Sequence, residues 1–147
     1  MTTNRSIVAP NIDTALLVLR IALGVTMIAH GYQKVFTFGF AGVASGFVQM
    51  GVPMASVTAP LVALLELFGG VAVLIGLLTR LASLGFVVDM LGAATFVHFK
   101  NGFFLPTGFE FVFVLLLLSV TLMLSGAGGI SVDAMIAARR SGTSVAP

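Results

Sequence analysis

Four long apolar stretches follow one another along the chain, separated by short segments rich in turn-forming residues. A helix needs about 20 mostly apolar residues to cross the hydrocarbon core of a bilayer. The stretches at residues 14–34, 59–78, 81–99 and 109–124 therefore predict four transmembrane helices. Turn formers interrupt the pattern at 51–53, 79–80, 101–102 and 105–108. We predict an all-α integral membrane protein whose four-transmembrane-helix bundle occupies residues 13–126.

The connection at residues 36–57 is long but not hydrophilic. We predict a short helix near residues 40–50 that lies in the membrane interface, in the first outer loop, because an apolar segment this short cannot span. Gly51 is expected to cap its C-terminus and Pro53 to stop it. Residues 1–12 and 127–147 are rich in Ser, Thr, Gly and Ala, and they are predicted to be cytoplasmic tails that are loose at their ends.

The composition supports a membrane location. The chain is 59% hydrophobic and 8% charged, whereas soluble domains are about a quarter charged. The lipid bilayer is therefore the expected environment. A net charge of +2 without a basic face gives no reason to expect a nucleic-acid partner. The chain has no cysteine, which excludes disulfides and thiol redox chemistry by its own residues.

Basic residues are distributed unevenly between the two predicted sides of the membrane. The outer side carries Lys34 and Lys100. The side that holds both termini carries four arginines, Arg5, Arg80, Arg139 and Arg140. Because basic residues are enriched in cytoplasmic segments, we predict that both termini are cytoplasmic.

Two opposite charges are predicted to lie at similar depths in the inner half of the bundle. At about 1.5 Å per residue, Arg20 lies roughly 10 Å and Asp89 about 13 Å from the cytoplasmic end. Charges within a bilayer usually face the bundle interior and pair with one another. We therefore predict a structural ion pair between Arg20 and Asp89.

A second polar layer is predicted near the outer ends of the helices, below Lys34 and Lys100. By the same rise, Glu66 lies at about 21 Å and Glu110 at about 24 Å, and His30 and His98 lie at about 26 Å. Glu66 is the strongest candidate, because a carboxylate inside an apolar, glycine-rich helix is costly to bury. The alternative is a salt bridge from Glu66 to His30, Lys34 or Arg20 that holds two helices in register. Gly31, next to His30, is expected to let a neighbouring helix approach.

The residues of this outer layer are candidates for proton handling and for ligand binding. Glu66 and His30 are the candidate proton-handling groups, and the catalytic residues stay unknown. The candidate ligand contacts are His30, Lys34, Glu66, His98 and Glu110. The matched depth of the two histidines permits a bis-histidine haem, but we favour a quinone or small-ligand contact, or a structural role, over haem. The spacing of histidines and carboxylates indicates no metal site.

Phenylalanines add an asymmetry, because all but two of the 13 lie in the predicted outer half. They could line a cavity for a lipophilic ring such as a quinone head group. The alternative is an aromatic belt on the lipid-facing surface. Phenylalanine is less typical of such belts than Trp or Tyr, which slightly favours packing in the interior.

Several short motifs, in order, resemble the DoxX family of small four-helix bacterial membrane proteins. They are L-R-I-A-L-G at 19–24, H-G-x2-K at 30–34, G-V-P at 51–53, E-L-F-G-G-V-A-V-L-I-G-L-L-T-R at 66–80, V-H-F-x2-G-F-F at 97–104 and G-F-E at 108–110. The resemblance covers nearly the whole chain, from about residue 14 to Asp133. It implies a multi-pass protein of the bacterial inner (plasma) membrane and an association with oxidoreductase complexes. The dithiol chemistry of the wider superfamily cannot apply here, because cysteine is absent.

Three functions are compatible with these features. The first is a membrane subunit or partner of a quinone-linked redox system, with a lipophilic-ligand site near the outer face. The second is a non-catalytic scaffold or assembly subunit with a protein partner, or a homo-oligomer. The third and least favoured is a small proton-coupled transporter with Glu66 as its coupling carboxylate, because the sequence suggests no unwound helix at the midplane.

Overall fold

The computed structural model describes residues 11–141, and all regular secondary structure in that range is helical. The first helical rod consists of α1 (Ile12–Tyr32) and the π-helical η1 (Gln33–Phe38), and α2 (Gly39–Gln49) follows it. The second rod consists of α3 (Ala55–Leu64), the π-helical η2 (Leu65–Gly69) and α4 (Gly70–Ile75). The third consists of α5 (Thr79–Ala93), the π-helical η3 (Ala94–His98) and the short 3₁₀ turn η4 (Phe99–Asn101). The last helices are α6 (Glu110–Ser125) and α7 (Val132–Arg140).

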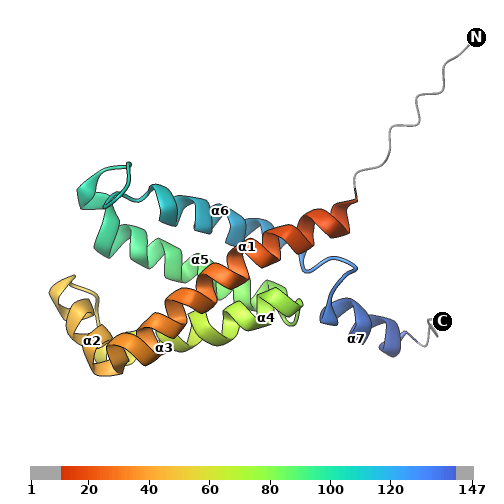
Figure 1. The fold of residues 1–147 in the computed structure, drawn as a ribbon, viewed down its shortest axis with the longest axis horizontal. Helices are drawn as coiled ribbons and strands as arrows, with labels where there is room; N and C mark the ends of the chain where they lie inside the picture. The colour runs from red at the N-terminus through yellow and green to blue at the C-terminus, as the bar shows by residue number, and fades with distance from the viewer. Residues whose placement is uncertain (1–10, 142–147) are drawn as a thin grey trace, which may run out of the picture.

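The rods form an up-and-down bundle in which sequence neighbours lie side by side (Figure 1). α1 packs on η2 and α4, α4 packs on α5, and α5 packs on α6, which returns to contact α1. α1 begins at the same end of the bundle at which α7 lies, and the α2 segment and the 99–109 loop lie at the other end (Figure 1). Below, these are called the terminal end and the loop end.

Three helical segments are long and apolar enough to cross a membrane: 12–49, 55–75 and 79–101. α6 is also apolar but has 16 residues. The prediction of an all-helical membrane protein is thereby confirmed. A membrane crossing by α6 stays a prediction.

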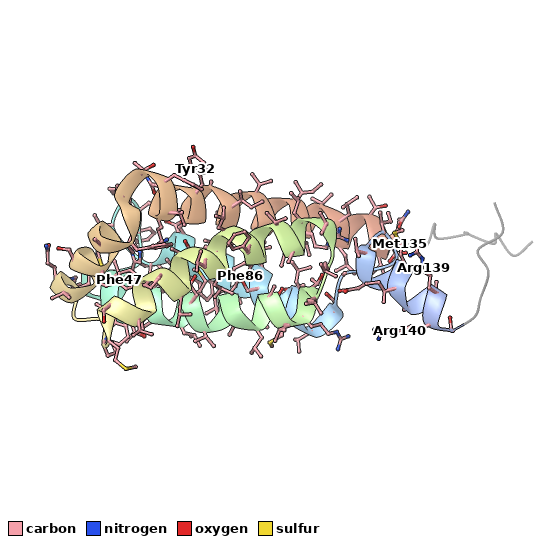
Figure 2. The ribbon with its side chains drawn as sticks, turned by 90° about the horizontal axis from the view of Figure 1, so that it is seen from below. Tyr32, Phe47, Phe86, Met135, Arg139 and Arg140 are labelled. Carbon is pink, nitrogen blue, oxygen red and sulfur yellow. The ribbon has the colours of Figure 1, made fainter. Side chains whose placement is uncertain are left out.

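Side chains from the three rods and from α6 fill the core. Leu23 and Met27 of α1 lie against Val73 of α4, Phe86 of α5 and Leu122 of α6 in one buried cluster. Phe86 lies between the helices, whereas Tyr32 points away from the bundle (Figure 2). Many large apolar side chains cover the outside, as expected for a protein whose surroundings are lipid.

The predicted short helix in the first loop is present as α2, at Gly39–Gln49. Gly39 begins it with φ +67°, so the chain turns sharply away from η1, and α2 packs against α3. Gly51 follows the helix with φ +78°, and its N–H donates to the carbonyl of Val48. The cap at Gly51 is therefore as predicted, and the position of α2 in the membrane interface stays a prediction.

The predicted tail at 127–147 contains a helix that the sequence analysis did not predict, α7 at Val132–Arg140. Ser131 caps this helix, because its hydroxyl accepts a hydrogen bond from the N–H of Ala134. The N–H of Asp133 also donates to the carbonyl of Gly76, which ties α7 to the bundle. Residues 1–10 and 142–147, which make up most of the predicted N-terminal tail and the end of the C-terminal one, lie outside the described residues.

Candidate functional site

A buried ion pair joins the first two rods near the loop end of the bundle. The Nζ of Lys34 donates to Oε2 of Glu66 over 2.5 Å. The Glu66 side chain is 5% exposed and the Lys34 side chain 19%. The salt-bridge alternative predicted for Glu66 is therefore confirmed, with Lys34 as the partner.

Asp89 of α5 adds a second carboxyl group to this pair. It interacts electrostatically with both Glu66 and Lys34, and it lies within hydrogen-bonding reach of Glu66. Its buried Oδ2 receives no hydrogen bond from any residue in 11–141. Two carboxylates and one ammonium thus share an interior site, which leaves room for a proton or for one more hydrogen-bond donor. We call Lys34, Glu66 and Asp89 the acidic cluster.

Local helix geometry helps to place two members of the acidic cluster. Lys34 belongs to η1 and Glu66 to η2, and both segments are π-helical. A π-helical turn holds an extra residue, so it widens the helix and rotates the side chains that follow it. Such turns are rare and occur frequently at functional sites. These turns could not be predicted from the sequence, because one extra residue does not interrupt an apolar run.

Close backbone packing beside the cluster fixes the distance between the first two rods. A Cβ atom built on Gly31 would collide with the backbone nitrogen and Cα of Leu67. On the next turns, a Cβ on Gly70 would lie 2.8 Å from the backbone nitrogen of Ile28. Only glycine permits this approach, which is typical of helix contacts in membranes. The expectation that Gly31 lets a neighbouring helix approach is confirmed.

The predicted Arg20–Asp89 ion pair is wrong. Arg20 is 2% exposed and donates to four carbonyl oxygens: those of Val73, Leu74, Ala127 and Ile130, over 2.6–3.0 Å. The first two belong to the last turn of α4, where the helix dipole favours a cation. Depth alone suggested the pairing with Asp89, but carbonyls at the end of α4 and in the loop after α6 accept four hydrogen bonds from the guanidinium, which has five N–H donors. One carboxylate could not accept as many in this geometry.

Sequence reasoning missed a second structural carboxylate at the terminal end. Asp133 accepts hydrogen bonds from the N–H groups of Leu78, over 2.8 Å, and Thr79, over 3.1 Å. It therefore caps the N-terminus of α5 from outside that helix. The electrostatic attraction between Asp133 and Arg20 links the two groups. The only signal in the sequence was the capping serine two residues earlier, which predicts a helix but not its partner.

The remaining candidates of the outer layer do not contact the acidic cluster through any hydrogen bond or ion pair among residues 11–141. His30 is exposed, and its ring centroid lies 6.1 Å from that of Phe111. The Nδ1 of His98 lies 3.0 Å from the carbonyl oxygen of Thr107. Glu110, the first residue of α6, accepts from the N–H of Leu105 in the preceding loop over 3.2 Å. Ligand roles for these three residues stay predictions.

The phenylalanines of the loop end lie mostly on the outside of the bundle. Nine of the eleven in the predicted outer half are exposed, namely Phe36, Phe38, Phe40, Phe96, Phe99, Phe103, Phe104, Phe111 and Phe113. The preference for interior packing of these phenylalanines is therefore wrong, and their exposure fits an aromatic belt on the lipid-facing surface. Within the described part of the chain, histidines and carboxylates form no group of three that could hold a metal ion.

Comparison with known proteins assigns the family. The sequence profile of the DoxX family matches residues 15–99, which is more than half of the chain. The chain belongs to the DoxX family. The resemblance seen in the motifs is therefore confirmed, and the matched region contains the whole acidic cluster. No solved structure matches the chain.

Curated relatives include "Putative oxidoreductase CatD" of Bacillus subtilis, which is 34% identical over 82% of this chain and 85% of the relative. "Inner membrane protein YqjF" of Escherichia coli is 37% identical over 67% of this chain and 62% of the relative. "Uncharacterized membrane protein Rv3486" of Mycobacterium tuberculosis is 35% identical over 51% of this chain and 45% of the relative. These similarities agree with a membrane protein built from several apolar helices.

Proposed function

We propose that the protein is the membrane component of a quinone-linked redox system, and that the acidic cluster binds the quinone head group and exchanges protons with it. The observation that carries this proposal is the buried Oδ2 of Asp89, an acceptor without a donor beside an ion pair inside the bundle. Buried polar atoms are otherwise nearly always hydrogen-bonded, so this atom is a natural position for a ligand donor.

The chemistry of the cluster fits both redox forms of a quinone. A quinone carbonyl needs a donor, and Lys34 supplies an ammonium that is 19% exposed. A hydroquinone hydroxyl needs an acceptor, and Oδ2 of Asp89 is one. Reduction of a quinone takes two electrons and two protons. Glu66 and Asp89 lie close enough to share a proton and pass it toward the head group.

A partner redox protein is the proposed electron source, because the chain has no cysteine with which to carry electrons itself. The name of the Bacillus subtilis relative supports an oxidoreductase context. The exposed phenylalanines at the loop end offer an apolar approach for a lipophilic ligand arriving from the bilayer.

The proposed placement in the membrane follows from the bundle. We place four spans in the membrane, with α6 as the fourth, because it packs along α5 in full contact with the core. We also place α2 in the outer interface and both termini in the cytoplasm of a bacterium, in its inner membrane. The name of the Escherichia coli relative supports the membrane assignment.

The competing function is a non-catalytic scaffold or assembly subunit. The close glycine contact between the first two rods favours this function. Beside that contact, the Lys34–Glu66 ion pair fixes the register of one rod against the other. Under this alternative the acidic cluster is purely structural and binds no ligand.

Quinone retention separates the two functions. The protein is purified in mild detergent, and bound quinone is extracted and quantified by mass spectrometry. The proposal predicts stoichiometric quinone in the wild type, loss of most of it in Asp89→Leu, and full retention in Lys100→Gln, an exposed control in η4 at the same end of the bundle. Wild-type protein without quinone, even after incubation with a soluble quinone analogue, contradicts the redox proposal and leaves the scaffold.

A further inference from the structure

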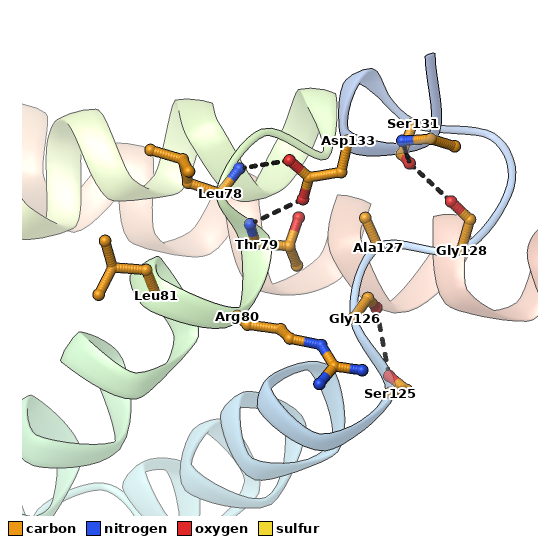
Figure 3. Close-up of a pocket in the computed structure, with 11 residues that line it drawn as sticks. Leu78, Thr79, Arg80, Leu81, Ser125, Gly126, Ala127, Gly128, Ser131 and Asp133 are labelled. Atoms are coloured by element: carbon orange, nitrogen blue, oxygen red, sulfur yellow. Dashed lines mark hydrogen bonds between the residues drawn. The ribbon is translucent and has the colours of Figure 1, made fainter. Parts of the chain in front are cut away.

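A groove of about 480 Å³ opens at the terminal end of the bundle, where the start of α5, the end of α6 and α7 meet (Figure 3). The residues that matter for its chemistry are Thr79, Arg80, Leu81, Ser125, Gly126 and Asp133. This groove lies at the opposite end from the acidic cluster and takes no part in the proposed redox function.

Arg80 gives the groove an unbalanced positive charge. Its side chain extends along the groove toward Ser125 and Gly126 (Figure 3). It is exposed and makes no hydrogen bond or ion pair with any residue of the described range. An arginine held along a groove wall without an internal partner is available for an external anion.

The carboxylate of Asp133, which also lines the groove, does not neutralise Arg80. Its two oxygens already accept from the N–H groups of Leu78 and Thr79. Its charge is attracted to Arg20, which is buried behind the groove. Both the hydrogen-bonding capacity and the charge of Asp133 are therefore largely used within the bundle.

A second polar group of the groove also lacks a partner. The Oγ1 of Thr79 is buried, and no residue in 11–141 forms a hydrogen bond with it. Thr79 itself is fully buried in the groove wall. A hydroxyl can donate to an anionic oxygen as readily as to a carbonyl. Thr79 and Arg80 both line the groove, so an anionic group bound in it lies beside both residues.

The rim of the groove is apolar. Leu78 is 59% exposed and Leu81 is 64% exposed. A cation beside an exposed apolar rim, at the end of a membrane helix bundle, complements a molecule with an anionic head and a hydrocarbon tail. Arg139 and Arg140 of α7 lie at the same end and add positive charge to it (Figure 2).

We propose that this groove binds the head group of an anionic phospholipid. Arg80 contacts the phosphate, Thr79 donates to it, and Leu78 and Leu81 contact the first part of the acyl chains. A free phosphate ester shares the head-group chemistry but lacks the chains, so it cannot use the leucine rim.

The test uses the full-length protein in mild detergent, titrated with phosphatidylglycerol or with phosphatidylcholine of the same acyl chains and observed by native mass spectrometry. We expect a clear preference for phosphatidylglycerol. In Arg80→Gln its affinity falls about fivefold, the effect of one basic residue near an anionic lipid. Arg80→Lys keeps the charge and most of the preference. Lys100→Gln, at the opposite end, leaves it unchanged.

Two results would overturn the proposal. One is equal binding of phosphatidylglycerol by the wild type and by Arg80→Gln, when both show the same thermal unfolding temperature. The other is displacement of the lipid by glycerol phosphate or inorganic phosphate at matched concentration, which would identify the ligand as a soluble anion. Because Arg80 is exposed, its replacement is not expected to disturb folding.

Discussion

The Nζ of Lys34 lies 2.5 Å from Oε2 of Glu66, and this ion pair joins the π-helical end of the first rod to the π-helical centre of the second. The two residues are 32 positions apart in the chain. Their contact places an ammonium, and through Asp89 a second carboxyl group, inside an otherwise apolar bundle. A buried pair of this kind costs desolvation of both ions, so it contributes specificity more than raw stability.

Replacing Lys34 and Glu66, singly and together, should change stability in a non-additive way. Lys34→Met leaves the two carboxyl groups of Glu66 and Asp89 without their cation and should lower the free energy of unfolding by about 3 kcal/mol. Glu66→Leu leaves Lys34 beside Asp89 as its counter-charge and should lower it less. The double variant leaves one carboxyl group, which can bind a proton, and should be clearly more stable than Lys34→Met. Denaturant unfolding in detergent measures all three. Lys100→Met, an exposed control, should change stability by less than about 0.5 kcal/mol. If the loss of unfolding free energy in the double variant equals the sum of the losses in the two single variants, Lys34 and Glu66 do not interact.

Replacing Arg20 with lysine should destabilise the protein. Arg20→Lys keeps the charge but replaces the planar guanidinium with one ammonium, which cannot reach four carbonyl oxygens on α4 and on the 127–130 loop at once. We expect a loss of about 3 kcal/mol or more in unfolding free energy. Arg139→Lys, on the exposed face of α7, is the matched control and should be neutral. Equal stability of the two variants would rule out a structural role for the Arg20 hydrogen bonds.

Alanine should affect stability differently at Gly31 and at Gly46. Gly31→Ala places a methyl group against the backbone of Leu67 and should destabilise the bundle by about 1–3 kcal/mol through overpacking. Gly46 of α2 has open space around its Cβ position. Gly46→Ala should therefore be neutral, or stabilising by up to about 1 kcal/mol through helix propensity. Thermal unfolding of both variants in the same detergent gives the comparison, and the reverse order would contradict the close contact.

The sequence predicted most of the fold because its strongest signal is physical and local. The length of each apolar run set each helix, and turn formers set the breaks, so each predicted span overlaps one of the three rods or α6. Gly31 and Gly51 were predictable for the same reason, since each is required by one local geometry. α7 was missed because its apolar content is low and the Ser131 cap was hidden in a glycine-rich stretch.

The candidate site was predicted only in part. Glu66 was identified because a carboxylate in an apolar helix is conspicuous, and Lys34 was among its possible partners. Asp89 was assigned to Arg20 because depth was estimated with a uniform α-helical rise, which says nothing about which helix faces lie opposite. The π-helical turns of η1 and η2 hold Lys34 and Glu66, and the carbonyls that bind Arg20 belong to a helix end and a loop. Neither feature has a pattern of its own in the sequence.

The fourth prediction concerns the carboxyl pair of Glu66 and Asp89. Two carboxylates in hydrogen-bonding reach repel each other unless a proton lies between them. Asp89→Asn supplies a permanent N–H donor to Glu66 and removes one acid, so it should keep or raise stability. Asp89→Leu cannot hydrogen-bond Glu66 and should lower it by about 1–3 kcal/mol.

Infrared spectroscopy gives an independent measure of the same proton. Wild-type protein should show the carbonyl band of a protonated carboxyl group, shifted in heavy water, and Asp89→Asn should lose that band. Glu110→Gln is the matched control, because Glu110 begins α6 outside the acidic cluster and its carboxylate accepts, among residues 11–141, from the N–H of Leu105. A band that persists in Asp89→Asn, or an asparagine variant as unstable as the leucine one, would show that Glu66 and Asp89 do not share a proton. The acidic cluster would then be an ion pair with a neighbour rather than a proton-exchanging site.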